Sequence, residues 1–230
     1  MKRAVRERID TLASEWALPP AAADQLVAVL AELERERSSI TTVRDPAQAV
    51  GRHLEDSLDG LRVPAVREAA EIADLGSGGG FPGLVLAIAL PESHVFLVES
   101  VRRKCDFLDR ATASAAIDNV TVVCDRAESW AQRELDVVTA RALAPLPVLA
   151  EYAAPLLRVG GTLVAWKGEP SVEERSAGDV AAAILGLAPG EEFGPATTAA
   201  TGVLITYTKV AETSDRFPRR PGMARKRPLA

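Results

Sequence analysis

The sequence has little of what several common kinds of protein site require. Among its 230 residues are only two cysteines, Cys105 and Cys124, and only two histidines, His53 and His94. One cysteine is expected on a helix and the other on a strand, which favours two buried thiols over a disulfide. No zinc-ligating constellation is visible, because the histidines stand far apart in the sequence. We therefore expect no metal site.

Long apolar runs are also missing. The sequence holds no stretch of about 18 apolar residues, so no membrane span is expected. Charged residues are spread over positions 1–18, where a secretory signal would carry its apolar segment, so we expect no such signal. A cytoplasmic monomer is the expected form. Its apolar fraction of 47% is enough for the core of one α/β domain with a short extension.

Positive charge is scarce overall but concentrated at one end. The net charge of −5 argues by itself against a nucleic-acid-binding protein. Residues 214–230, however, contain six basic residues opposed only by Asp215, so this tail carries +5 and the rest of the chain −10. We expect a basic arm, kept extended by its prolines, that binds RNA phosphates. The alternatives are a solvated tail, or a structural one with Phe217 buried. The candidate RNA-binding residues are Arg219, Arg220, Arg225, Lys226 and Arg227.

Glycine, in contrast, is concentrated in one stretch. Residues 72–90 read IADLGSGGGFPGLVLAIAL, in which an apolar run ends at Asp74, a glycine cluster follows, and seven apolar residues come next. This pattern predicts a strand, a glycine turn and a buried helix. A dinucleotide-binding turn would have a third glycine at position 81, where Phe81 stands, and Asp74 would repel a diphosphate. A ligand with a cationic end fits better.

The series D-x-G-x-G-x-G resembles motif I of the class I S-adenosylmethionine-dependent methyltransferases. In that general pattern Asp74, Gly76 and Gly78 belong to the cofactor site. Residues 94–98 predict the next strand, and Glu99 at its end can accept hydrogen bonds from both ribose hydroxyls. Without the glycine turn, Glu99 would be interpreted as a charge in water at the end of a strand.

The remaining pattern alternates strands and helices. Two amphipathic helices are expected within residues 1–36, and another at 101–115, 147–157 and 172–186. Further strands are expected at 119–124, 135–140, 162–166 and 203–210, whereas 191–201 gives no clear sixth strand. We predict an α/β fold of the class I methyltransferase type: a Rossmann-like, mostly parallel seven-stranded sheet whose last strand is antiparallel. The expected parts are an N-terminal helical extension (1–60), the α/β domain (61–212) and the basic tail (213–230).

Two further places carry candidate residues for the substrate side. On a helix predicted over residues 51–58, His53 and Ser57 share one face, and so do Arg52 and Asp56. An ordinary surface ion pair and a structural histidine are the alternatives. Arg141 follows the strand 135–140, and the carboxyl ends of parallel strands form the ligand crevice of such sheets. Arg141 is therefore expected to point into the site.

Four stretches together resemble one family: residues 41–58, 74–83, 125–128 with 138–146, and 217–229. They resemble the bacterial 16S ribosomal RNA guanine-N7 methyltransferases, the RsmG or glucose-inhibited division protein B family. The sequence departs from the family at Ser39-Ile40-Thr41, where Asn-Leu-Thr is frequent, and at Met223-Ala224, where a proline is usual.

The resemblance implies methyl transfer from S-adenosylmethionine to N7 of guanine 527 in 16S rRNA or the small ribosomal subunit. The cofactor contacts that it implies are Gly76, Phe81, Ala127, Glu128 and Arg141. Arg52, His53, Asp56 and Arg141 are the candidates on the substrate side, and none is a certain catalytic group. Guanine N7 has a free lone pair, so a catalytic base is not obligatory.

Three other functions remain open from the sequence. The same fold could methylate a small molecule or a protein, although the basic tail disfavours this. A non-catalytic RNA-binding assembly factor is disfavoured by the intact glycine turn with Asp74 and Glu99. An NAD-dependent oxidoreductase ranks below both because of Phe81.

Overall fold

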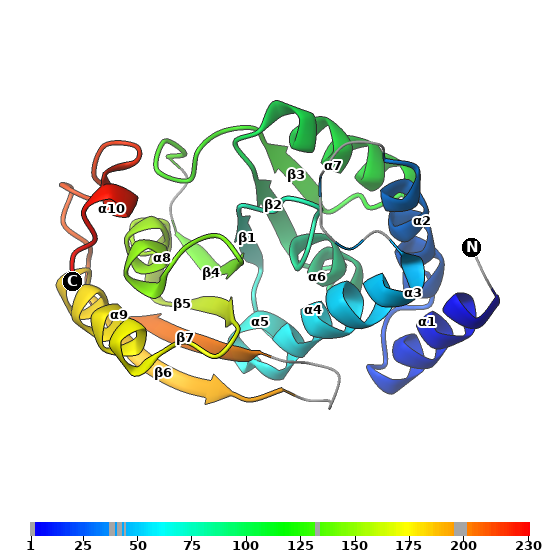
Figure 1. Cartoon of the computed structure of the whole chain (residues 1–230), viewed down its shortest axis with the longest axis horizontal. Helices are drawn as coiled ribbons and strands as arrows, with labels where there is room; N and C mark the ends of the chain where they lie inside the picture. Colours follow the sequence, from blue (N-terminus) through cyan, green and yellow to red (C-terminus); the bar gives the residue numbers. More distant parts are fainter. Residues whose placement is uncertain (1–2, 37–39, 41–42, 44, 132–133, 196–201) are drawn as a thin grey trace.

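A seven-stranded sheet forms the centre of the molecule (Figure 1). The computed structural model describes residues 3–36, 40, 43, 45–131, 134–195 and 202–230. The strand order is β3-β2-β1-β4-β5-β7-β6; the first five strands pair in parallel, and β7 is antiparallel to both neighbours. The predicted fold class is confirmed. The strands are β1 Glu71–Leu75, β2 His94–Val98, β3 Val120–Val123, β4 Leu135–Arg141, β5 Leu157–Lys167, β6 Leu187–Phe193 and β7 Val203–Lys209.

Helices cover both faces of this sheet because its strands alternate their side chains between two apolar clusters. Ile72 of β1 belongs to one cluster and its neighbour Ala73 to the other. The first cluster holds α1 Arg3–Glu15, α2 Ala22–Arg35, α6 Gly83–Ala89 and α7 Arg102–Ser114. The second holds α8 Leu146–Ala153, α9 Val172–Ile184 and α10 Met223–Lys226. Figure 1 shows α1 and α2 at one end of the molecule and α9 and α10 at the other.

The connection between α2 and β1 consists of short helical turns. They are α3 Pro46–Ala49, a π-helix Val50–Glu55, α4 Asp56–Leu58, a 3₁₀ turn Asp59–Arg62 and α5 Pro64–Arg67. Buried residues of this connection, such as Leu54 and Leu58, share the apolar cluster of α1, α2 and α6. The N-terminal segment therefore has no core of its own. Ser39, Thr41, Thr42 and Arg44, which belong to the stretches compared with the RsmG family, lie outside the described residues.

Two strands differ from their predicted limits. β5 begins at Leu157, earlier than expected, and includes Gly160 and Gly161, which the sequence pattern assigned to the end of a helix. Gly160 has φ +86°, and a Cβ on Gly161 would lie 2.8 Å from the Leu135 carbonyl oxygen. The glycines thus serve an irregular, close pairing of β5 with β4. β6 lies at Leu187–Phe193, mostly before the weak segment 191–201, of which residues 196–201 lie outside the described residues.

The two cysteines lie in different environments. Cys105 is buried on α7, where its thiol is 3.2 Å from the Glu99 carbonyl oxygen, whereas Cys124, just past β3, is exposed. The prediction of two buried thiols is therefore wrong for Cys124. Over the described ranges, no group of three or more histidine, cysteine or acidic residues is placed to hold a metal ion, and no helix is long and apolar enough to cross a membrane.

The C-terminal tail packs against the domain, so the prediction of an extended arm is wrong. Phe217 is 4% exposed, and residues 223–226 form the short helix α10 beside α8 (Figure 1). The cause is Glu151 of α8, which is 1% exposed and would be an unpaired buried charge without the tail. Arg219 pairs with it, with its Nη2 2.5 Å and its Nε 2.8 Å from the two carboxylate oxygens.

The start of α6 gives a test of the close packing at the glycine turn. A Cβ on Gly83 would overlap Leu97 and lie 2.8 Å from Asp74 Oδ2, whereas a Cβ on Gly51 would have no neighbour within 4 Å. We expect Gly83→Ala to lower the free energy of unfolding by about 1–3 kcal/mol. The matched control Gly51→Ala should be neutral or raise it by about 0.5–1 kcal/mol. Urea unfolding measures both, and equal midpoints would contradict this packing.

Candidate active site

The glycine turn between β1 and α6 is held by close backbone approaches. Gly76, Gly78 and Gly80 have φ values of +69°, +56° and +88°, a region that favours glycine. The Gly76 N–H donates to the Val98 carbonyl at 2.8 Å, and a Cβ on Gly76 would lie 2.6 Å from Leu143 Cδ1. The turn thus passes between the end of β2 and the loop that follows β4.

Asp74 lies beneath this turn and is only 1% exposed. Its Oδ2 accepts from the Gly83 N–H at 3.2 Å, and its Oδ1 accepts from the Thr139 hydroxyl at 3.0 Å. Burial raises the pKa of Asp74 to about 6, and its hydrogen bonds with Thr139 and Gly83 oppose the rise. These contacts connect β1 with β4 and α6. A direct contact of Asp74 with a cofactor stays a prediction.

A cavity of about 490 Å³ opens where β2, β3 and β4 end. Four of the predicted cofactor residues line it: Gly76, Glu99, Ala127 and Glu128. Glu99 is 5% exposed, and its carboxylate accepts from the Gly78 N–H at 3.1 Å and from the Val101 N–H at 2.8 Å. The sequence analysis did not single out the other lining residues used below, Lys104, Ala142, Leu143, Tyr152, Gly222 and Arg225.

A second cavity, of about 380 Å³, adjoins the first. It brings together the rest of the predicted site except Asp74 and Asp56: Gly78, Phe81, Arg52, His53 and Arg141. Gly76, Lys104 and Ala142 line both cavities. The two spaces therefore meet at the glycine turn and at the end of β4. A ligand in the first cavity and one in the second would meet there.

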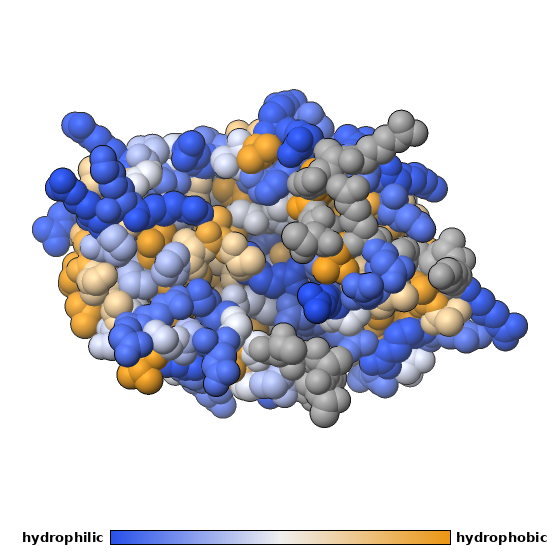
Figure 2. Space-filling model, in the orientation of Figure 1, coloured by the Kyte–Doolittle hydropathy of each residue, from blue (hydrophilic) through white to orange (hydrophobic). Residues whose placement is uncertain are grey.

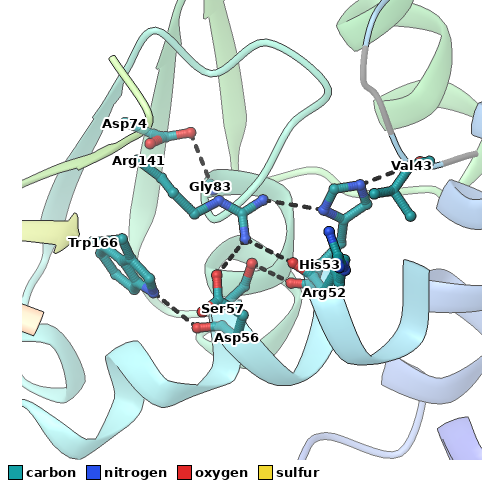
Figure 3. A network of polar contacts seen from close by, with 9 residues as sticks. All are labelled: Val43, Arg52, His53, Asp56, Ser57, Asp74, Gly83, Arg141 and Trp166. Atoms are coloured by element: carbon teal, nitrogen blue, oxygen red, sulfur yellow. Dashed lines mark hydrogen bonds and ion pairs between the residues drawn. The ribbon is translucent and has the colours of Figure 1, made fainter. Parts of the chain in front are cut away.

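Arg141 connects the end of β4 with the N-terminal segment (Figure 3). Its Nη1 lies 2.6 Å from Asp56 Oδ2 and 3.2 Å from the Arg52 carbonyl oxygen. Trp166 of β5 donates its indole N–H to the Asp56 carbonyl at 2.8 Å. The alternative of an Arg52–Asp56 surface pair is therefore wrong, because Asp56 pairs with Arg141. Residues 50–55 form a π-helix, so the α-helical spacing behind that alternative does not apply.

His53 packs between Phe81, Val43 and Arg141. Its ring stacks on Phe81 with centroids 4.5 Å apart and planes inclined by 12°. Nε2 lies 3.3 Å from the Val43 carbonyl oxygen, and Nδ1 lies 3.4 Å from Arg141 Nη2. This arrangement fits a neutral ring that donates from Nε2 and accepts at Nδ1. Burial, and then the positive charge of Arg141, lower the pKa of His53 to about 4, so the ring is neutral at neutral pH.

The five basic residues predicted to bind RNA do not form one surface. Arg219 pairs with buried Glu151, and Arg225 lines the first cavity and donates to the Leu143 carbonyl at 2.8 Å. Arg220, Lys226 and Arg227 are exposed. Hydrophilic residues cover the region around α10 on the face shown in Figure 2.

The comparison with known proteins decides the family. The model of the family described as rRNA small subunit methyltransferase G matches residues 21–190. The chain belongs to this family. It is 40% identical over 206 residues to the ribosomal RNA small subunit methyltransferase G of Synechococcus elongatus, covering 84% of each chain. It is 39% identical over 221 residues to the protein of the same name from Deinococcus radiodurans, covering 90% of this chain and 85% of that one.

Solved structures with the same fold are more distant in sequence. An S-adenosylmethionine-dependent O-methyltransferase from Thermotoga maritima has a TM-score of 0.56 at 17% identity, covering 81% of this chain and 73% of that one. Fibrillarin from Aeropyrum pernix, solved with bound S-adenosylmethionine, has a TM-score of 0.52 at 16% identity, covering 63% and 68%. Family and fold together make this rRNA small subunit methyltransferase G family member an S-adenosylmethionine-dependent methyltransferase.

The residues of the first cavity fit this cofactor. Gly76 leaves open a space that a Cβ would fill, and the Glu99 carboxylate, with one backbone donor on each oxygen, retains lone pairs for hydroxyl donors. Acidic groups and backbone carbonyls suit the cationic end of the cofactor. The adjoining second cavity leaves room for a methyl acceptor beside it.

The pKa of His53 gives a test of the second cavity. Replacing Arg141 with methionine removes a positive charge, so we expect the His53 pKa to rise from about 4 while staying below its usual 6.5, because burial remains. NMR titration of the ring protons measures it, and His53→Gln assigns the signal, since the chain has only two histidines. Arg158→Met, at the opposite end of the sheet, is the control. An unchanged pKa in Arg141→Met would contradict the proximity.

The same titration has a defined effect on stability. Since the folded-state pKa is lowered, the unfolded chain takes up the His53 proton first as the pH falls, and stability is lost between pH 6.5 and about 4. Asp74 has the opposite sign, because its raised pKa makes the folded state bind the proton first between pH 3.8 and about 6. The two contributions oppose each other over most of this range.

Proposed function

We propose that this protein transfers the methyl group of S-adenosylmethionine to N7 of a guanine in 16S rRNA, guanine 527 by its family resemblance. The observation that supports this most is the meeting of two cavities at Gly76 and Ala142. The first fits the nucleoside of the cofactor. The second, with the His53–Phe81 stack and a guanidinium on its wall, suits an unstacked base.

The cofactor site in this proposal combines the residues of both cavities. S-adenosylmethionine supplies an electrophilic methyl group on its sulfonium. Glu99, at the end of β2, accepts hydrogen bonds from the ribose hydroxyls, and the glycine turn at Gly76 and Gly78 lets the backbone approach the ligand. Ala127 and Glu128 border the adenine end. Phe81 and Arg141 lie where the reacting groups meet.

On the substrate side, the proposed work is positioning rather than proton removal. N7 of guanine has a free lone pair in the neutral base, so attack on the methyl group needs no general base. The Asp56 carboxylate is paired with Arg141 at 2.6 Å, which suits a residue that orients the guanidinium. Arg141 can donate to acceptor atoms of the guanine or to a neighbouring phosphate. The neutral His53 ring adds a flat surface without adding charge.

The wider assignment follows from the same proposal. The partner is 16S rRNA or the small ribosomal subunit, and the protein works as a monomer in the cytoplasm, where this RNA is found. We keep residues 1–60, 61–212 and 213–230 as three parts: helical extension, methyltransferase domain and tail. The ion pair between Asp56 and Arg141 supports a role of the extension in building the substrate side of the site.

Arg52 gives the first test of this function. Its carbonyl accepts from Arg141, whereas its exposed side chain borders the second cavity, so Arg52→Ala changes the side chain alone. We expect methylation of 16S rRNA to fall about tenfold or more, with cofactor affinity within about twofold of the unchanged protein. Arg35→Ala, on α2, is the control, since Arg35 pairs with Glu32 at 3.6 Å.

Radiolabelled methyl incorporation measures the rate, calorimetry measures cofactor affinity, and mass spectrometry locates the modified base. Deproteinised 16S rRNA and intact small subunits should both be assayed, because the two forms of substrate present the guanine differently. A normal rate in Arg52→Ala would make its side chain an ordinary surface group. Methylation at an atom other than guanine N7 would contradict the proposed reaction.

The exposed basic residues of the tail give a second test. Replacing Arg220, Lys226 and Arg227 with alanine should lower the slope of log affinity against log salt by about 0.7 for each lost phosphate contact on single-stranded RNA. The control removes three exposed positive charges elsewhere, Arg3, Arg35 and Arg102. Equal slopes for the tail variant and the unchanged protein would remove the tail from the RNA-binding surface.

A further inference from the structure

The C-terminal segment forms part of the wall of the first cavity. Gly222 and Arg225 line this cavity together with Glu128, Leu143 and Tyr152. These two residues lie far along the chain from the strand ends that build the rest of the cavity. The expectation that all cofactor residues precede position 142 therefore omits one side of the cavity.

The segment is held in place at several points on both sides of α10. Arg219 makes its ion pair with buried Glu151, and Phe217 and Ala224 are buried in the cluster around α8. The Gly222 N–H donates to Glu128 Oε1 at 2.9 Å, so the tail engages a predicted cofactor residue directly. These contacts hold α10 beside the cavity.

Arg225 lies among groups from three elements. Its Nη2 donates to the Leu143 carbonyl at 2.8 Å, in the loop after β4. Its guanidinium also hydrogen bonds with Tyr152 of α8, whose hydroxyl interacts with Glu128 as well. Burial and the negative charge of Glu128 raise the pKa of Tyr152, and the hydrogen bond from Arg225 opposes this. The guanidinium is thus oriented at the wall of the cavity.

We propose that the C-terminal segment 217–227 completes the cofactor site and that Arg225 contacts the adenosine end of S-adenosylmethionine. The proposal rests on cofactor binding and does not depend on which atom of the RNA is methylated. Both ends of the cofactor were considered. The sulfonium and ammonium groups would be repelled by a guanidinium, whereas ring nitrogens of adenine are hydrogen-bond acceptors.

The position of Arg225 agrees with this orientation. The reacting end of the cofactor belongs where the two cavities meet, at Gly76 and Ala142. Glu99, after β2, is placed for the ribose, and the loop after β3, with Glu128, borders the space beyond it. Arg225 shares Tyr152 with Glu128 and so lies at this far side, away from the second cavity.

The test measures binding rather than activity. Truncating the tail would leave the Glu151 charge buried without its partner, so a point variant is preferable. Arg225→Met keeps the aliphatic stem and removes the guanidinium, and Arg225→Lys restores a cation with fewer donors. Arg216→Ala removes the same charge from the exposed start of the tail and is the matched control. Calorimetry uses two probes, S-adenosylhomocysteine and 5′-methylthioadenosine, which lacks the amino-acid end, with a melting curve for each variant.

We expect Arg225→Met to weaken both probes about fivefold to tenfold, Arg225→Lys to recover part of the loss, and Arg216→Ala to bind normally. Affinities within about twofold of the unchanged protein in Arg225→Met would overturn the proposal. A loss confined to S-adenosylhomocysteine would move the contact to the amino-acid end and overturn the adenosine assignment. An equal loss in Arg216→Ala would reduce the effect to general charge. Failure of rRNA methylation at guanine N7 would leave these binding results unaffected.

Discussion

The site depends first on the buried carboxylate of Asp74. A charged group that is 1% exposed is unfavourable unless it is hydrogen bonded, and the raised pKa of about 6 reflects this. Thr139 of β4 and the first N–H of α6 compensate it. By binding both, Asp74 fixes the glycine turn against the sheet. Since Gly76 in that turn lines both cavities, their relative placement depends on this one residue.

A second constraint joins the N-terminal segment to the sheet. The ion pair of Arg141 with Asp56 is 2.6 Å long and only partly exposed, so it is screened less than a surface pair. It is reinforced by Trp166, which holds the Asp56 backbone from β5. The helices before β1 also share the apolar cluster of α6 and α7. They are therefore a wall of the site and pack as part of the domain.

The sequence predicted what local periodicity and strand ends determine. The glycine turn, the order of elements and the placement of Glu99 and Arg141 at strand ends follow from such rules. The partner of Asp56 did not, because a π-helix replaces the α-helical spacing. The path of the tail depends on Arg219 and Glu151, which are 68 residues apart and share no local pattern. The available signal was a single glutamate within the apolar helix Leu146–Ala153.

The folded path of the tail also changes how its charge should be counted. Residues 214–230 carry +5, but Arg219 is neutralised by Glu151, and Arg225 is directed to the first cavity. The charge that can meet RNA phosphates is therefore carried by the remaining exposed residues, chiefly Arg220, Lys226 and Arg227. At physiological salt, charges more than about 8 Å apart at the surface are largely screened. Local placement of these cations, rather than the net charge of −5, then governs how the protein approaches RNA.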